Sequence, residues 1–322
     1  MPPHIVEAYL KGAAELSKAS AEGLSKALRY FREITLEAPD FAPGLAGHAV
    51  CLYCLGWFGH APAHEVFAAA KQLALRAVAV DDSVSGAHNA LATMHWLLDG
   101  DLAAAEAEYR RAIELSPSDA DAHTMFALFL CGAARYAESI AEAHYALRLS
   151  PMSLIQNQAA AWAHLHAGQY PEAEVQATRT IQLSPGSLQP LFVLGWAQWR
   201  QGRNEEAVAA FEQALTLSRE AWSLSFLGHV YARLGRTEDA RRLLRETEAL
   251  LADGHASPIA LVIIHGGLGH LDQAFDWLEK ACRMRIDLVF LTRGFPGLDP
   301  LRSDPRFDEI LSRTGVAPGT SA

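Results

Sequence analysis

Histidines are the residues with the clearest potential for chemistry, and the sequence has 14 of them. His60 and His64 are four residues apart, the spacing that places two metal ligands on one helical face. Pro62 lies between them and interrupts the helix that such a site would need. His164 and His166 are two residues apart and should point to different sides of a helix. We therefore expect no metal site and no cofactor.

The cysteines and glycines also offer little support for catalysis. Cys51 and Cys54 form a single Cys-x-x-Cys motif without the second pair that a zinc site would need, so buried, apolar thiols are expected. The run from His265 to His270, HGGLGH, resembles a phosphate-binding loop, but no strand precedes it and we expect a helix–helix turn there. No serine motif or carboxylate pair suggests a reaction. The sequence predicts that the protein is not an enzyme.

Composition narrows the possible partners. The chain has 322 residues, half of them hydrophobic, and no apolar run of the roughly 20 residues that a membrane span requires. Its beginning lacks the features of a secretory signal, and four cysteines are too few for a disulfide framework. The formal net charge of −10 argues against binding to a phosphate backbone. We expect a cytoplasmic protein that binds neither nucleic acid nor membrane, and its oligomeric state stays open.

The elements that would position any site repeat along the chain. Leu-Ser-Pro occurs three times, with Pro117, Pro151 and Pro185 each separated by 34 residues. Another 34 residues on, Leu217 and Ser218 stand without the proline. Upstream of each of these points, small residues alternate with one large residue at helical spacing, which is typical of two antiparallel helices in close contact. Each unit is therefore a helix–turn–helix that must stack on its neighbours.

A 34-residue unit of this composition resembles the tetratricopeptide repeat. The best matching positions are Leu194, Gly195, Ala207, Phe211 and Ala214 in one repeat, followed by Leu227, Gly228, Tyr231 and Ala240 in the next. The resemblance implies an all-α, right-handed superhelical solenoid of about eight helix–turn–helix repeats with a C-terminal capping helix.

The repeat pattern also predicts the domain boundaries. We expect the array to cover residues 1–294, with a long loop between paired helices at Gly56–Phe67, where an excess of nine residues falls. Residues 295–322 should form a cap and a flexible tail, because Asp304 and Pro305 are a helix-start signal. Phe307 and Leu311 should pack on the eighth repeat.

The C-terminal sequence carries a further resemblance. A repeat array followed by WLEKA (Trp277–Ala281) and LDPLRSDPRF (Leu298–Phe307) is similar to the sensory C-terminal half of certain bacterial signalling proteins. In those proteins the array follows a winged-helix regulator, an adenylate cyclase or a serine/threonine kinase. No such domain precedes Met1 here, so both a stand-alone member and a piece of a longer protein stay open, and no effector activity is carried over.

Resemblance to the repeat family also implies a binding groove, because the first helix of each repeat lines a concave surface. The lysine and asparagine that let some members clamp a C-terminal carboxylate are absent from the corresponding positions, so a chaperone-tail clamp is not expected. Transfer by register gives the following candidates for partner binding: Gln158, Trp162, His166, Phe192, Trp196, Trp199, Arg200, Trp222, His229 and Arg233.

Several of these candidates form an apolar stripe that repeat packing does not require. Phe192, Trp196 and Trp199 follow at helical spacing, and Trp162 precedes Trp196 by 34 residues. Exposed aromatics beside Arg200 have the composition of an interaction hot spot. We favour a scaffold or sensory module that binds a peptide or protein partner. The alternative is a regulatory or structural array in which these aromatics only fill the superhelix, and a metal-dependent enzyme is the least favoured class.

Overall fold

Every regular element of the computed structural model is helical over the described ranges, residues 1–18, 21–57, 61, 63–253, 256–284 and 294–313. The side chains of residues 21, 63 and 64 are not described. This confirms the all-α prediction. None of the helices in these ranges combines the length and the apolar character needed to cross a bilayer. His60, the side chain of His64 and the predicted flexible tail after residue 313 lie outside what the structure describes.

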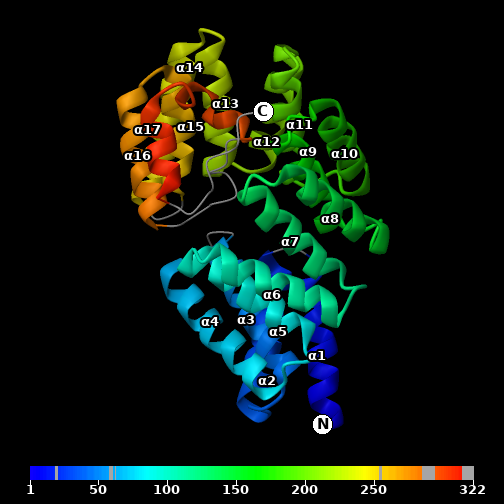
Figure 1. The fold of residues 1–322 in the computed structure, drawn as a ribbon. Helices are drawn as coiled ribbons and strands as arrows, with labels where there is room; N and C mark the ends of the chain where they lie inside the picture. Colours follow the sequence, from blue (N-terminus) through cyan, green and yellow to red (C-terminus); the bar gives the residue numbers. More distant parts are fainter. Residues whose placement is uncertain (19–20, 58–60, 62, 254–255, 285–293, 314–322) are drawn as a thin grey trace. The chain divides into compact units, whose positions relative to one another are not determined.

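Contacts divide the chain into two compact units, residues 1–126 and 127–322, and the division falls inside α7. In the first unit consecutive helices pack as pairs: α1 with α2, α3 with α4 and α5 with α6 (Figure 1). The bounds are α1 Pro3–Leu16, α2 Ala21–Glu37, α3 Ala42–Trp57, α4 Ala63–Val80, α5 Ser85–Met94, the π-helical turn η1 His95–Asp99, α6 Leu102–Leu115 and α7 Ala120–Gly132.

The second unit continues the paired arrangement, with α9 on α10, α11 on α12, α13 on α14 and α15 on α16. The first helices of successive pairs also touch, since α11 contacts both α9 and α13, and α13 contacts α15. The bounds are α8 Tyr136–Leu149, α9 Leu154–His166, α10 Tyr170–Leu183, α11 Gln189–Arg200, α12 Asn204–Leu217, α13 Ala221–Arg233, α14 Thr237–Ala252, α15 Pro258–Leu268, α16 Leu271–Met284, the 3-10 helix η2 Pro296–Leu301 and α17 Pro305–Ser312.

The 34-residue period has a direct counterpart in the backbone. Serines of the repeated Leu-Ser motif end α6, α8, α10 and α12, and each donates its N–H to the carbonyl four residues earlier. From α5–α6 onward, the described turn between paired helices contains one residue in the left-handed region, which favours glycine. These residues are Gly100, Ala134, Gly168, Gly202, Gly235 and Gly269.

Close helix packing depends on the small positions of the repeat. Ala207 and Ala214 are fully buried, and they flank the equally buried Phe211. A Cβ at Gly195 would lie 2.7 Å from the Phe211 ring, so glycine lets α11 approach α12 closely. This is the helix contact that the spacing of small and large residues predicts.

One predicted loop is shorter than expected. Gly56 lies at the end of α3 and Phe67 lies inside α4, so the predicted loop over Gly56–Phe67 is wrong at both ends. Gly56 serves close packing instead of a turn, because a Cβ there would come within 2.5 Å of the Phe67 ring. A glycine that makes room for a neighbouring helix is easily mistaken for a helix breaker.

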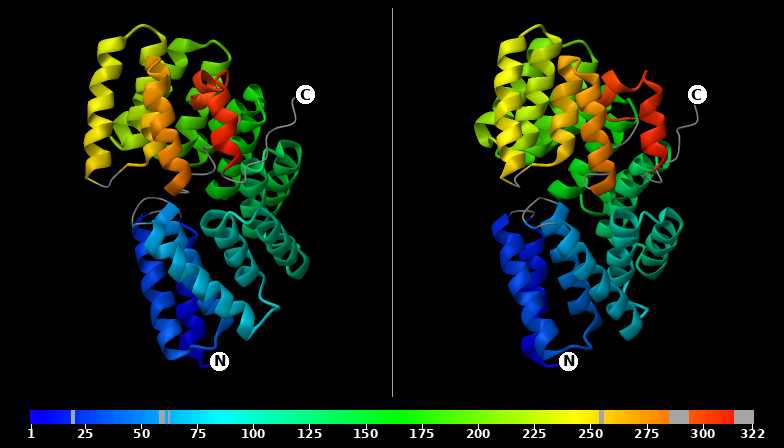
Figure 2. Two further views of the ribbon diagram at one scale, coloured as in Figure 1. Left: turned by 60° about the vertical axis from the view of Figure 1, so that its left-hand side comes forward. Right: turned by 90° about the vertical axis from the view of Figure 1, so that its left-hand side faces the viewer.

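The last helix, α17, begins at the predicted helix-start signal. The Asp304 side chain accepts a hydrogen bond from the Arg306 N–H and starts α17, which lies beside α16 (Figure 2). Phe307 and Leu311 are both buried, as expected for residues that pack on the eighth repeat. Arg306 also places its guanidinium over the Phe275 ring at 4.1 Å and pairs with Asp272.

Candidate functional site

The candidate partner-binding residues lie on α9, α11 and α13, the first helices of three successive repeats. Trp162 on α9 and Trp196 on α11 are joined by Phe226 on α13, which the sequence prediction did not include. All three side chains are buried, with Trp162 6% exposed and the other two fully covered. The Trp196 and Phe226 ring centroids lie 5.3 Å apart, and α11 contacts both α9 and α13.

A residue from the C-terminal segment occupies this surface. Phe295 is fully buried, and its ring centroid lies 5.6 Å from Trp196, 6.2 Å from Trp162 and 5.9 Å from Phe226. The His166 ring stacks on it at 5.8 Å. We call these four contacting side chains the Phe295 pocket. Its edge-on and tilted ring pairs have the geometry that aromatic side chains prefer.

The backbone before Phe295 also fits closely against α9. A Cβ on Gly294 would lie 2.1 Å from the carbonyl oxygen of His166, so no other residue could occupy this position without moving the segment. After Phe295 the chain enters η2, which packs against α15, and its Leu298 and Leu301 are fully buried. The segment is thus held at two places, in the Phe295 pocket and on α15.

Charged groups close one edge of the pocket. Arg200, at the end of α11, pairs with Asp299 of η2 and places its guanidinium 5.1 Å from the Tyr170 ring centroid. Arg302 approaches the same carboxylate at 2.7 Å and donates a 2.9 Å hydrogen bond to the backbone oxygen of Phe295. The segment therefore offers α11 both an aromatic side chain and, four residues later, a carboxylate.

The two predicted histidines of this surface are buried and neutral. Burial and, to a smaller extent, the positive charge of Arg302 together lower the pKa of His166 to about 3. Burial and the nearby Arg233 hold the pKa of His229 at about 4, against the opposing effect of the 2.9 Å hydrogen bond from its Nδ1 to the Ile263 carbonyl. Neither imidazole carries a charge near neutral pH, so both act as flat, weakly polar packing groups.

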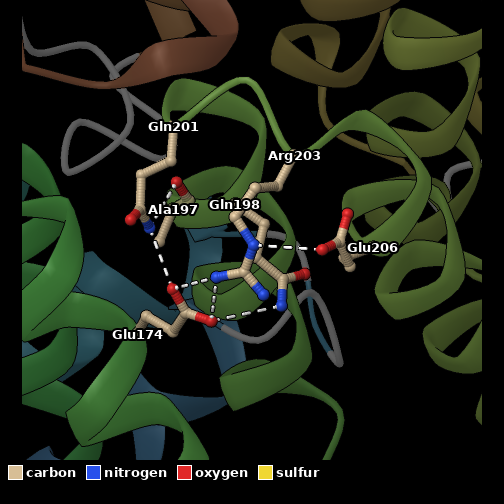
Figure 3. Close-up of polar contacts among 6 residues, drawn as sticks. All are labelled: Glu174, Ala197, Gln198, Gln201, Arg203 and Glu206. Carbon is tan, nitrogen blue, oxygen red and sulfur yellow. Dashed lines mark hydrogen bonds and ion pairs between the residues drawn. The ribbon is translucent and has the colours of Figure 1, made fainter.

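A polar network fixes the end of α11 that carries Arg200. Glu174 on α10 accepts hydrogen bonds from Gln201 and Arg203, at 2.9 and 2.7 Å, and Arg203 also bonds Glu206 (Figure 3). Burial would raise the pKa of Glu174, but the hydrogen bonds from Gln201, Arg203 and Gln198 outweigh it and lower that pKa. The carboxylate thus stays ionised and ties the turn after α11 to α10.

The remaining candidates differ in how far they are covered. Phe192 is 1% exposed and its ring lies 4.9 Å from Phe226, so it belongs to the packing between α11 and α13. Gln158, Trp199 and Trp222 are partly exposed, and Arg233 is exposed. We expected the aromatic stripe to be exposed. The structure places its central members under Phe295 because the C-terminal segment covers them.

The residues that sequence reasoning missed are Phe226, Phe295, Asp299 and Arg302. Phe226 lies between register positions assigned to the groove and could have been found from its apolar type on the same helix. The other three lie in the segment that was interpreted only as a cap. Its prolines indicated an irregular path, but no periodicity indicated where that path would lead.

Residues with potential for metal or nucleophilic chemistry are used for packing. Cys51 is fully buried, burial raises its thiol pKa, and burial raises the pKa of Cys54 to about 12, so both thiols stay protonated. His164 contacts His144 through a 2.8 Å Nε2–Nε2 hydrogen bond, while His166 faces Phe295, so the two neighbours point to different sides as predicted. Among the described residues, no three His, Cys, Asp or Glu side chains could hold a metal ion together.

The glycine run near the C-terminus has a packing role. Gly266 and Gly267 lie inside α15, not in the predicted turn, and only Gly269 is the left-handed residue that ends the helix. A Cβ at Gly267 would come within 2.7 Å of the His229 backbone. Gly267 therefore allows α15 to approach α13, while a Cβ at Gly266 would come within 3.0 Å of Leu301 in η2. The phosphate-loop likeness has no structural counterpart.

Comparison with known proteins identifies the repeats. Residues 63–120 and 159–225 match one tetratricopeptide-repeat family model, and residues 198–257 match a second. The chain contains tetratricopeptide repeats. No curated protein has significant sequence similarity to it.

Solved structures agree on the fold. The type IV pilus biogenesis factor PilW is 20% identical, with a TM-score of 0.55 over 66% of this chain and 94% of PilW. A tetratricopeptide repeat protein from Parabacteroides merdae is 16% identical, with a TM-score of 0.53 over 76% of this chain and 92% of that protein. The match in the APC/C hetero-tetramer Cut9–Hcn1 is 15% identical, with a TM-score of 0.63 over 90% of this chain and 52% of its counterpart. At these identities the likeness is one of fold.

Proposed function

We propose that residues 127–322 form a non-catalytic protein-interaction module, whose surface on α9, α11 and α13 binds a segment of a partner protein. One observation carries this proposal. The surface already holds an irregular stretch of polypeptide, with Phe295 in an aromatic pocket and Asp299 paired to Arg200 at its edge. A surface that binds its own chain in this way has the apolar and charged groups that peptide recognition needs.

Within this proposal the candidate residues take two roles. Trp162, His166 and Trp196 contact the bound aromatic side chain directly. The partly exposed Gln158, Trp199 and Trp222, with Arg200 and Arg233, lie at the rim, where they are accessible to a longer partner. Buried aromatic residues surrounded by a polar rim have the composition of an interaction hot spot. A sensory role in signalling, which the C-terminal resemblance implies, would use the same surface.

A second hypothesis is favoured by the deep burial of the aromatic side chains. Trp196 and Phe226 are fully covered, and Phe192 is 1% exposed. If Phe295 never leaves, these rings only stabilise a regulatory or structural array, and a partner binds elsewhere. The two hypotheses predict different effects of rim substitutions on peptide affinity.

Peptide selection distinguishes the two hypotheses. A random display library is selected against the purified protein and against its Phe295→Ala variant. We expect the selected peptides to lose about tenfold in affinity, or about 1.4 kcal/mol, when Arg200→Glu or Trp222→Ala is introduced. Val175→Ala is a matched control, because Val175 is 70% exposed on α10, the second helix of its repeat. Failure of both proteins to select peptides, or peptides indifferent to the rim variants, contradicts the proposed function.

A further inference from the structure

We infer that Phe295–Asp299 is a built-in competitor for this surface, and that the partner segment carries an aromatic side chain followed four residues later by a carboxylate. The inference rests on the proposed function and adds to it the chemistry of the partner and a control on access. Three features of the described residues support it: the pocket, its charged edge and an unsatisfied donor.

The partner segment needs an aromatic side chain because of the rings that line the Phe295 pocket. Trp162, Trp196 and Phe226 come from three different repeats and all approach one side chain within 6.2 Å of its centroid. An aliphatic side chain could fill part of this space, but it would lose the ring–ring contacts, which add to the gain from apolar burial. A flat ring also stacks on neutral His166. The pocket therefore selects for an aromatic residue.

The partner segment needs a carboxylate because of the position of Arg200. Its guanidinium is held between Asp299 and the Tyr170 ring, and its helix end is fixed by the Glu174 network. Arg302, the other cation at this carboxylate, follows Asp299 in the same stretch of chain and would leave with it. Arg200 would then lack its anionic partner, Asp299. A partner segment with a carboxylate four residues after its aromatic residue restores that pair.

The chain's own segment is an imperfect occupant. The Trp196 indole Nε1 is buried and has no hydrogen-bond partner among the described residues, although the rest of its ring is packed on all sides. Buried donors are normally satisfied, because leaving one unpaired is unfavourable. A partner segment that places an oxygen beside Nε1 gains a hydrogen bond that the internal segment does not make. This gives a partner the advantage it needs to displace Phe295.

Covalent connection gives the internal segment the opposite advantage. Phe295 belongs to the same chain as its pocket, so it is presented there at a high effective concentration. A free peptide of the same sequence should therefore bind the parent protein weakly. Removing the internal contact should make the same peptide bind more tightly.

The test uses a fluorescent peptide of residues 294–303, GFPGLDPLRS, and the full chain. Two variants open the pocket by different means. Phe295→Ala removes the anchor, and Gly294→Ala introduces a Cβ that collides with the His166 carbonyl. Gly186→Ala is the matched control, because a Cβ at Gly186 meets nothing within 4 Å. We expect at least about tenfold tighter peptide binding by both opened variants and none of this gain in the control.

Changes to the peptide test the recognition chemistry. In the opened variants, replacing the peptide's phenylalanine by alanine should abolish binding, while replacing it by tyrosine or tryptophan should retain most of it. Arg200→Glu should weaken binding of the parent peptide about tenfold, and a peptide with lysine in place of its aspartate should recover it. Circular dichroism of both opened variants reports whether the helices remain folded.

The outcomes separate this inference from the proposed function. If folded, opened variants bind the peptide no better than the parent, the segment is not a competitor and the inference is overturned. If library peptides still bind them but lack the aromatic–acidic spacing, the proposed function stands alone. If neither peptide source binds, both fail. A parent dimer that binds the peptide more strongly on dilution would assign the segment to the pocket of a second copy, which also overturns competition within one chain.

Discussion

Replacing Trp196 by alanine tests most directly how the centre of the site is built. The side chain is fully buried, with ring centroids of Phe211, Phe226 and His229 between 5.3 and 5.4 Å away and Phe295 at 5.6 Å. Truncating a buried tryptophan costs about 3–5 kcal/mol of unfolding free energy. We expect a value in the upper half of this range, because each lost ring pair adds about 0.5–1.5 kcal/mol beyond apolar burial.

Trp199→Ala is the matched control for this measurement. Trp199 lies one helical turn further along α11 and is partly exposed, so its truncation should lower the unfolding free energy by about 1 kcal/mol or less. Urea unfolding followed by far-ultraviolet circular dichroism gives both values, and each variant should keep its helical content without urea. A loss below about 1 kcal/mol for Trp196→Ala would refute the packed arrangement. If the variant unfolds early, yet its folded fraction still captures the selected peptides, Trp196 is a packing residue and not part of the binding surface.

Three further predictions follow from single side chains. Ala134 has φ 58° where the other turns have glycine, so Ala134→Gly should raise the unfolding free energy by about 0.5 kcal/mol in urea titrations. His229 stays neutral in the fold with a pKa of about 4 but binds a proton when unfolded. Stability is therefore lost as the pH falls below about 6.5, and the parent should lose about 2 kcal/mol more than His229→Asn between about pH 7 and pH 5. Because the pKa of Glu174 is lowered by its hydrogen bonds, the parent should exceed Glu174→Gln in thermal stability above about pH 4.5 and lose that advantage at lower pH, as the carboxyl group protonates.

The repeat architecture could be predicted from the sequence because its cause is local and recurs. Ala207 and Phe211 have their places fixed by the contact between two adjacent helices, and the same contact is made again one period away. A single repeat therefore carries nearly all the information that its own packing requires. The loop prediction at Gly56 was wrong because the role of this glycine depends on a contact with another helix. Gly56 leaves room for Phe67 on α4, and the sequence alone does not distinguish such a glycine from one that ends a helix.

The presence of Phe295 in the site could not be predicted, because its contacts do not recur with the 34-residue repeat. The 34-residue separation of Trp162 and Trp196 predicts that they continue one stripe, but nothing in that spacing predicts that Phe295 contacts both of them. The information was present in a different form. An aromatic stripe beyond what repeat packing needs must be covered by something, because an apolar surface of this kind is unfavourable in water. The chain itself contains a segment with one phenylalanine, no helical periodicity and a carboxylate placed to meet Arg200. When a repeat array has more apolar surface than its packing requires, the terminal segments of the same chain should therefore be searched for residues that cover it. The chemistry of the covering segment then describes the partner that could replace it.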